Sequence, residues 1–103
     1  MADYRVIVSR RAFSNLNEIL DYIKIDSPVN AVRTVDRLQK AMESLHMFPL
    51  RYPVVVGSKR SRGAVRRMPV SSYLVYYRVS EIEKVVRVLT VRHAARRQPR
   101  RFD

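Results

Sequence analysis

Two helical stripes in direct succession constrain the fold of this 103-residue chain more than any other feature. In each segment apolar residues recur every three or four positions, as one face of an amphipathic helix requires. The first stripe runs from Arg11 to about Lys24, and the second follows Ser27-Pro28, a side-chain cap with a proline at the first helical position. The stripes consist of Ala12, Leu16, Ile19, Leu20 and Ile23, and of Ala31, Val32, Val35, Leu38, Met42 and Leu45. Because few residues join them, the two helices must form an antiparallel hairpin.

Segments rich in β-branched and aromatic residues flank this hairpin and predict strands. One precedes it, and the others follow Pro49; they are Tyr4–Ser9, Val54–Val56, Val65–Val70, Tyr73–Val79 and Lys84–Arg92. Short polar turns separate the last three, so these pair antiparallel, and the last is apolar on both faces, as a central strand is. The order predicts an α+β domain with an N-terminal strand, an antiparallel helical hairpin and an antiparallel β-meander, the hairpin packed on one face of the sheet. Tyr22 and Tyr52 are expected to close the helix–sheet interface.

Charge is distributed unevenly along the chain. Residues 1–50 carry seven basic and six acidic side chains, whereas residues 51–103 carry fourteen basic and three acidic ones. The second half therefore accounts for +11 of the net charge of +12, and 17 of the 21 basic residues are arginine. Since the planar guanidinium group suits phosphate and carboxylate, the pattern favours nucleic acid or an acidic protein segment as a partner. The alternative is a basic surface that serves solubility alone.

Composition excludes several other classes of function. No cysteine occurs, which excludes disulfides and thiol chemistry, and only two glycines occur, which excludes a glycine-rich phosphate loop. His46 and His93 have no carboxylate at ligand spacing, so neither a metal nor another cofactor is expected. No signal peptide or membrane-length apolar run is present, which predicts a soluble cytoplasmic protein. Residues 1–103 form a single domain, in which 96–103 are expected to be a loosely held basic tail.

Basic residues on the predicted strands are the candidates for chemistry. They are Arg66, Arg67, Arg78, Arg87 and Arg92, followed directly by His93. Alternation on paired strands lets several of these side chains share one face, where they could bind phosphates or stabilise the transition state of phosphodiester cleavage. His93 could then act as a general acid or base. The alternative reading is that the arginines are solvated or salt-bridged and that His93 is structural.

The ordered set of segments resembles the ParE/RelE superfamily of toxins from bacterial type II toxin–antitoxin modules. The resemblance covers nearly the whole chain, from the opening strand and helix through Ser27–Ala31, the Arg66–Val70 and Tyr73–Val79 strands and the closing Val88–Arg96 segment. It implies a RelE-like fold. It also implies two possible activities, because RelE-like members are ribosome-dependent mRNA endoribonucleases and characterised ParE-like members act on DNA gyrase.

Three features favour the ParE branch. The helical hairpin is long, the ending Arg92-His93…Arg96 is ParE-like, and no tyrosine follows Tyr77, where RelE enzymes carry an aromatic residue near their C-terminus. The resemblance therefore implies a gyrase inhibitor without catalytic residues. The alternative ribonuclease would use Arg66, Arg78, Arg87, Arg92 and His93, and a second alternative is a non-catalytic nucleic-acid-binding module.

The resemblance also implies partners for the basic surface. A cognate antitoxin, ParD-like and acidic, would dock a helix in a groove and neutralise the positive half of the chain. Promoter DNA would be bound only through that antitoxin, and gyrase or a gyrase–DNA complex would be the target. The residues expected to bind target or antitoxin are Arg60, Arg62, Arg66, Arg67, Arg78, Arg87, Arg92, Arg96 and Arg97.

Overall fold

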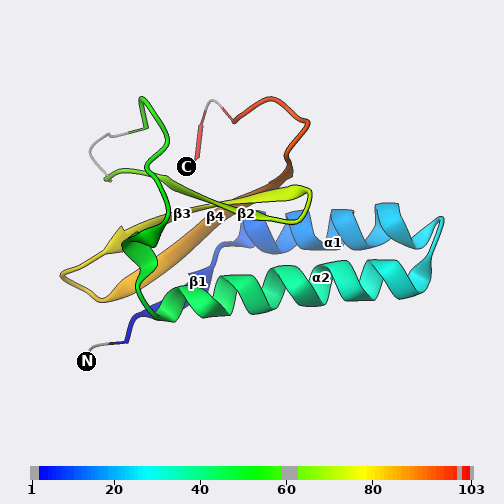
Figure 1. Ribbon diagram of the computed structural model, residues 1–103, viewed down its shortest axis with the longest axis horizontal. Helices are drawn as coiled ribbons and strands as arrows, with labels where there is room; N and C mark the ends of the chain where they lie inside the picture. The colour runs from blue at the N-terminus through cyan, green and yellow to red at the C-terminus, as the bar shows by residue number, and fades with distance from the viewer. Residues whose placement is uncertain (1–2, 59–62, 100, 103) are drawn as a thin grey trace.

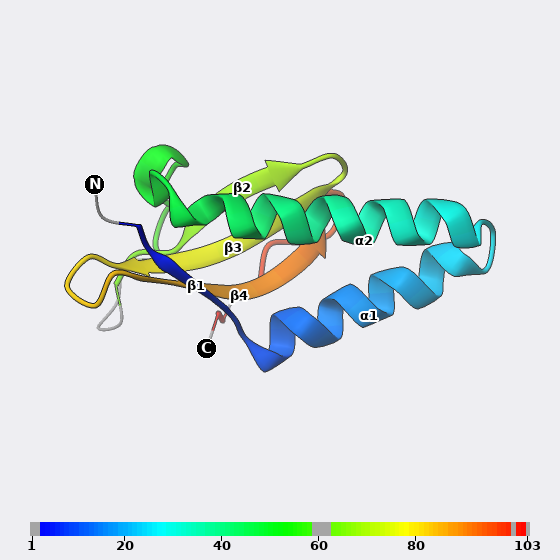
Figure 2. The same cartoon turned by 90° about the horizontal axis from the view of Figure 1, so that it is seen from below.

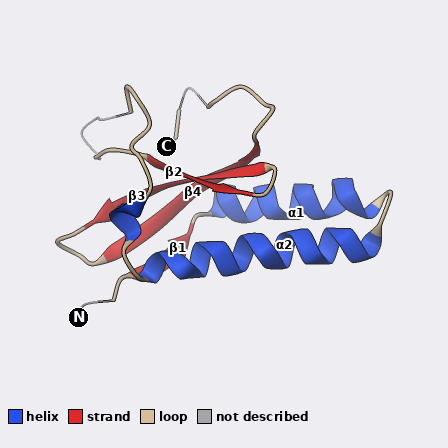
Figure 3. Cartoon of the chain, viewed as in Figure 1, coloured by secondary structure: helices blue, strands red, loops and turns tan. Residues whose placement is uncertain are grey.

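The structure, a computed structural model, describes residues 3–58, 63–99 and 101–102. Its elements follow the predicted order of strand, helical hairpin and β-meander (Figures 1 and 3). They are β1 (Arg5–Val8), α1 (Arg10–Lys24), α2 (Pro28–Glu43), two short 3₁₀ turns (Ser44–His46 and Pro49–Arg51), β2 (Arg66–Val70), β3 (Tyr73–Ser80) and β4 (Val85–His93). The predicted α+β class is confirmed: two helices pack on a four-stranded sheet.

Serine side chains begin both helices. The Ser9 Oγ accepts a hydrogen bond of 3.0 Å from the Ala12 amide, and the Ser27 Oγ accepts one of 3.2 Å from the Asn30 amide. Each bond satisfies one of the amide groups that the first turn of a helix leaves without a partner. Pro28 then occupies the start of α2, as the sequence predicted.

The sheet is mixed, with the strand order β1-β4-β3-β2. Strands β2, β3 and β4 pair antiparallel as predicted, and β4 is a central strand. The parallel pairing of β1 with β4 was not predicted from the sequence. In the register of β3 and β4, a β-bulge between Tyr76 and Tyr77 interrupts the regular pairing.

The main core lies between the helical hairpin and one face of the sheet (Figure 2). Its buried residues are Ala12, Leu16, Leu38, Met42, Leu45, Met68, Val70, Val75, Tyr77, Val86, Val88 and Val91. A second, smaller cluster consists of Val55, Val65 and Tyr76, with Phe102 packed against it. We call the sheet face opposite the helices the open face. The two clusters explain why β3 and β4 are apolar on both sides.

Three local predictions were wrong. Val54–Val56 is not a strand: Val54 forms one isolated bridge with Arg66, and Val56 is 95% exposed. Val32 and Tyr22 are exposed rather than buried, because the hairpin extends past the end of the sheet (Figures 1 and 2). Tyr52, in contrast, packs against the main core as predicted.

The described residues of the C-terminal segment contact the open face. The Phe102 ring lies 5.1 Å from the Tyr76 ring, and Pro99 is buried. Arg11 donates a hydrogen bond of 3.0 Å to the Arg101 carbonyl, and Arg67 donates one of 3.2 Å to the Gln98 Oε1. The single-domain organisation and the loose hold on segment 96–103 stay predictions.

Candidate functional site

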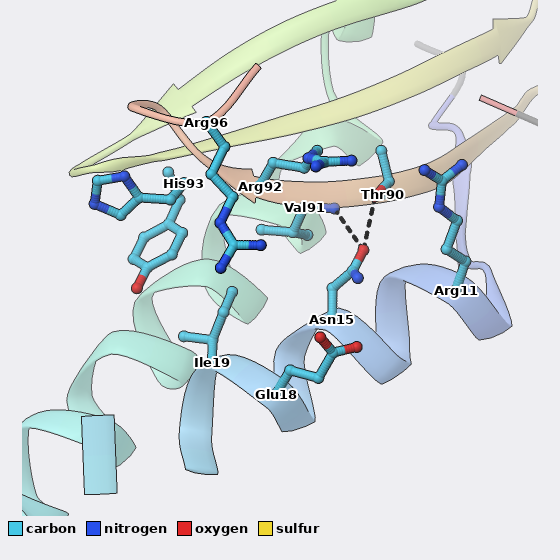
Figure 4. A pocket seen from close by; sticks show the side chains of 10 residues that line it. Arg11, Asn15, Glu18, Ile19, Thr90, Val91, Arg92, His93 and Arg96 are labelled. Carbon is cyan, nitrogen blue, oxygen red and sulfur yellow. Dashed lines mark hydrogen bonds between the residues drawn. The ribbon is translucent and has the colours of Figure 1, made fainter. Parts of the chain in front are cut away.

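The N-terminal half of α1 completes the edge of β4. Strand β1 ends at Val8, whereas β4 continues to His93, so the far part of β4 has no strand on that side. Directly after the end of β1, the Ser9 Oγ donates a hydrogen bond of 2.9 Å to the Leu89 carbonyl of β4. Asn15 follows, its Oδ1 accepting bonds of 2.7 Å from the Thr90 Oγ1 and 3.0 Å from the Val91 amide (Figure 4). These contacts fix the position of α1 against the end of β4.

A pocket of about 250 Å³ opens between α1 and the end of β4, and we call it the α1–β4 pocket (Figure 4). It is lined by Arg11, Asn15, Glu18, Ile19, Tyr73, Thr90, Val91, Arg92, His93 and Arg96. The sequence predicted Arg92, His93 and Arg96 as site residues, and the structure brings these three together. It missed Arg11 and Asn15, because a polar residue beside an apolar helical stripe has the same pattern as a solvated one.

The α1–β4 pocket is electropositive. It gathers three guanidinium groups, from Arg11, Arg92 and Arg96, against the single carboxylate of Glu18. Among the residues that the structure describes, Arg92 and Arg96 have no side-chain hydrogen bond or ion pair. The site therefore suits an anionic group, for which arginine supplies several N–H donors in one plane.

The backbone of the turn that follows β4 hydrogen-bonds to the His93 side chain. Its Nδ1 accepts a hydrogen bond of 3.1 Å from the Ala95 amide, and its ring meets the Tyr73 ring edge-to-face at 5.3 Å. Burial raises the pKa of Tyr73, and the neighbouring Tyr22 hydroxyl raises it further. Tyr73 and His93 thus form an aromatic pair beside the arginines.

A second pocket, of about 510 Å³, lies on the open face, and we call it the open-face pocket. Arg78 and Arg87 stand directly opposite each other on β3 and β4 and both line it, together with Phe102. Arg87 is 4.0 Å from the Glu83 carboxylate, and the Arg78 Nε donates a hydrogen bond of 3.4 Å to the Gly63 carbonyl. Arg11 is the only lining residue that this pocket shares with the α1–β4 pocket.

The remaining predicted arginines belong to neither pocket. Arg66 donates hydrogen bonds to the Leu50 carbonyl (3.2 Å) and the Tyr52 carbonyl (2.7 Å) and so holds the connection that follows α2. Arg67 binds Gln98, and Arg97 is exposed. Arg60 and Arg62, both predicted as binding residues, lie outside the described residues.

The described part of the chain offers no metal site, since no three of its histidine, aspartate and glutamate side chains come together as ligands. Within that same part, no helix has the length and apolar content to span a membrane.

Sequence comparison assigns a family. Residues 6–98 match the family described as the ParE toxin of the type II toxin–antitoxin system parDE. A curated relative, Toxin RelE2 of Caulobacter vibrioides, is 33% identical over 92 residues, which cover 89% of this chain and 97% of the relative.

Solved structures share the fold at lower identity. The chromosomal ParDE system of P. aeruginosa matches with a TM-score of 0.70 at 19% identity, covering 87% of this chain and 95% of that one. The RelBE2 toxin–antitoxin complex of Mycobacterium tuberculosis matches with a TM-score of 0.62 at 22% identity, covering 93% and 97%. The archaeal RelE–RelB complex of Pyrococcus horikoshii matches with a TM-score of 0.65 at 17% identity, covering 92% and 99%. The family match over residues 6–98 and the curated relative together show that the chain belongs to the ParE toxin family, within the ParE/RelE superfamily of type II toxin–antitoxin systems.

Proposed function

We propose that this toxin acts in the cytoplasm as a non-enzymatic inhibitor of DNA gyrase. The observation that carries the proposal is the separation of the residues that an RNA-cleaving site would need. A nuclease of this type requires a proton-transferring group within hydrogen-bond reach of the phosphate and cations arranged around the same phosphate. The five candidates do not share one pocket.

The five candidate nuclease residues lie in three different environments. Arg66 is engaged by backbone carbonyls, and Arg78 and Arg87 line the open-face pocket. Arg92 and His93 line the α1–β4 pocket, where the His93 Nδ1 accepts a hydrogen bond from its own turn. This arrangement supports a surface that binds a partner rather than a centre that cleaves RNA.

The partner in the resting cell is a cognate acidic antitoxin of the ParD type. The net charge of +11 over residues 51–103 supports this, because an acidic segment would neutralise it. The solved relatives include a ParDE system and RelB–RelE complexes, in which a toxin is found with its antitoxin. Promoter DNA would be bound through the antitoxin.

A supercoiling assay with purified gyrase tests the proposal. Stoichiometric toxin should inhibit supercoiling, and the acidic protein encoded beside the toxin gene should restore it. Intact supercoiling at a stoichiometric excess of toxin would count against gyrase as the target. Steep salt dependence of DNA binding without growth arrest on expression would instead indicate a plain nucleic-acid-binding module.

A ribosome-dependent ribonuclease is the second candidate. Two observations favour it: the curated relative carries the name RelE2, and Arg78 and Arg87 stand opposite each other on the open face. Cleavage of mRNA in a translating extract, lost in the variants His93→Ala and Arg78→Gln, would establish this activity. An extract in which mRNA stays intact at toxin levels that stop growth would exclude it.

A further inference from the structure

The α1–β4 pocket carries more positive charge than its own residues neutralise. Three guanidinium groups against the one carboxylate of Glu18 leave two formal positive charges. A phosphomonoester carries a charge of about −1.5 to −2 at neutral pH, whereas a carboxylate or a phosphodiester carries only one negative charge. The charge of the pocket therefore matches a phosphomonoester better than a nucleic-acid backbone or an acidic side chain.

The hydrogen-bond donors that line the pocket come from three parts of the chain. Arg11 comes from the first turn of α1, Arg92 from β4, and Arg96 from the turn after β4 (Figure 4). Asn15 contributes as well. A backbone amide can only donate, so the Val91 amide fixes which side-chain atom of Asn15 is the oxygen. Within the described residues, the Asn15 Nδ2 has no acceptor, so it is available to donate a hydrogen bond to a ligand.

The size and the rim of the pocket indicate what is attached to the phosphate. About 250 Å³ is below the roughly 300–1,000 Å³ of sites that enclose a whole drug-sized ligand. A pocket of this size is expected to take the phosphate group and to leave the base at the rim. There the Tyr73 and His93 rings lie edge-to-face. Aromatic rings are the surfaces on which unpaired bases stack.

We propose that the α1–β4 pocket binds a nucleotide through its phosphomonoester group, with the base against the rings of Tyr73 and His93. The shared chemistry is that of a free nucleoside monophosphate and of the 5′-phosphorylated end of a nucleic acid. This role does not depend on gyrase inhibition, so either can fail without the other.

Calorimetric titration of the full chain with matched probes tests the proposal. Adenosine 5′-monophosphate should bind saturably, inorganic phosphate more weakly, and adenosine least, because the phosphomonoester supplies most of the contacts. A short single strand with a 5′-phosphate is then compared with the same strand bearing a 5′-hydroxyl. Tight binding of the monophosphate alone identifies a free nucleotide as the ligand, and tight binding of the phosphorylated strand identifies a nucleic-acid end.

Neighbouring arginines provide a matched pair of variants. Arg96→Gln removes a pocket donor and should weaken binding of adenosine monophosphate about tenfold or more, as loss of a charged hydrogen bond does. Arg97→Gln removes the same charge one residue along, outside the pocket lining, and should change affinity less than about twofold. Glu18→Gln should tighten binding several-fold, whereas Glu43→Gln, on α2, should not.

Three results would overturn the proposal. One is the lack of saturation by adenosine monophosphate up to roughly 10 mM. Another is an equal loss of affinity in Arg96→Gln and Arg97→Gln, which would indicate general surface charge. The third is equally tight binding of the 5′-phosphate and 5′-hydroxyl strands, which would mean that the pocket recognises backbone phosphodiesters. Circular dichroism of each variant confirms that an observed loss reflects the pocket and not unfolding.

Discussion

At the scale of single residues, Asn15 connects the site to the fold. Its Oδ1 accepts hydrogen bonds from both the Thr90 Oγ1 and the Val91 amide, on the edge of β4 beyond the last residue that pairs with β1. A partly buried amide that lost this partner would remain without a hydrogen bond, which is costly.

Substitution of Asn15 separates stability from binding. Asn15→Ala should lower the free energy of unfolding by about 1–3 kcal/mol, because the Val91 amide loses its acceptor. Asn15→Asp keeps an acceptor at that place and should lose much less stability, yet it replaces the Nδ2 donor and should weaken nucleotide binding. Urea denaturation measures the first effect and titration the second. Equal destabilisation by both variants would show that the acceptor is not what matters.

Tyr77 gives the protein a specific sensitivity to alkali. It is fully buried, and its hydroxyl donates a hydrogen bond of 2.6 Å to the Pro49 carbonyl. Burial raises the pKa of Tyr77 from 10.0 to about 12, although the Arg66 and Arg51 guanidinium groups act in the opposite direction. The folded state therefore keeps a proton that the unfolded state releases first.

The stabilisation linked to Tyr77 should be complete below about pH 10 and should disappear as the pH rises to about 12, a loss of at most roughly 3 kcal/mol. Tyr77→Phe, which has no ionisable group, should show a flatter dependence of stability on pH over that range. Melting curves of both proteins across the range measure the difference. Parallel curves would show that Tyr77 does not titrate differently in the folded and unfolded states.

The candidate site was predictable only in part, because only some of its residues are close to one another in the sequence. Arg92, His93 and Arg96 are close in sequence, so the end of one strand and the turn after it bring them together. Arg11 and Asn15 reach the same pocket from α1 only through tertiary packing, which local periodicity does not encode. Alternation suggested that several strand arginines share one face, and Arg78 and Arg87 do stand opposite each other, but Arg87 and His93 lie toward opposite ends of β4.

At the scale of elements, the residue that caps α1 also bonds to the sheet, whereas the residue that caps α2 only caps its helix. The Ser27 Oγ caps α2 at its solvent-exposed end. The Ser9 Oγ caps α1 and also donates a hydrogen bond to the Leu89 carbonyl of β4. A single hydroxyl thus joins the helix to the sheet.

The two caps form a matched pair for mutation. Ser27→Ala should lower the free energy of unfolding by about 1 kcal/mol, the usual effect of losing a cap. Ser9→Ala should lower it by about 2 kcal/mol, because the cap and the bond to the Leu89 carbonyl are lost together. Urea denaturation of both variants measures the difference. Equal losses would mean that the contact between Ser9 and β4 adds no stability.

Helices were easier to predict than strand partners. The period of the first stripe placed α1, and the Ser27-Pro28 cap placed the start of α2, within a residue of the observed bounds. The parallel pairing of β1 with β4 escaped prediction because it joins residues about eighty positions apart. Val54–Val56 has the composition of a strand, yet it lies where the chain forms a single bridge to the start of β2. Exposure of Val32 follows from the length of the hairpin, which exceeds the sheet beneath it.

At the scale of the whole molecule, several of the arginines predicted as site residues line one of two pockets on the surface of the fold. One lies between α1 and β4 and the other on the open face, and Arg11 lines both. An acidic antitoxin that covered either pocket would lower the electrostatic repulsion within the chain. The division of the arginines over two surfaces agrees with a toxin that binds its target without cleaving it.

The most direct measurement of that claim is the amount of gyrase–DNA cleavage complex formed in the presence of the purified toxin. Supercoiled plasmid, gyrase and ATP are incubated with increasing toxin, and the linear DNA released by detergent and protease is quantified. A non-enzymatic gyrase inhibitor predicts linear DNA that rises with toxin and depends on gyrase. Unchanged linear DNA and normal supercoiling, together with mRNA cleavage by the same preparation on translating ribosomes, would contradict the account.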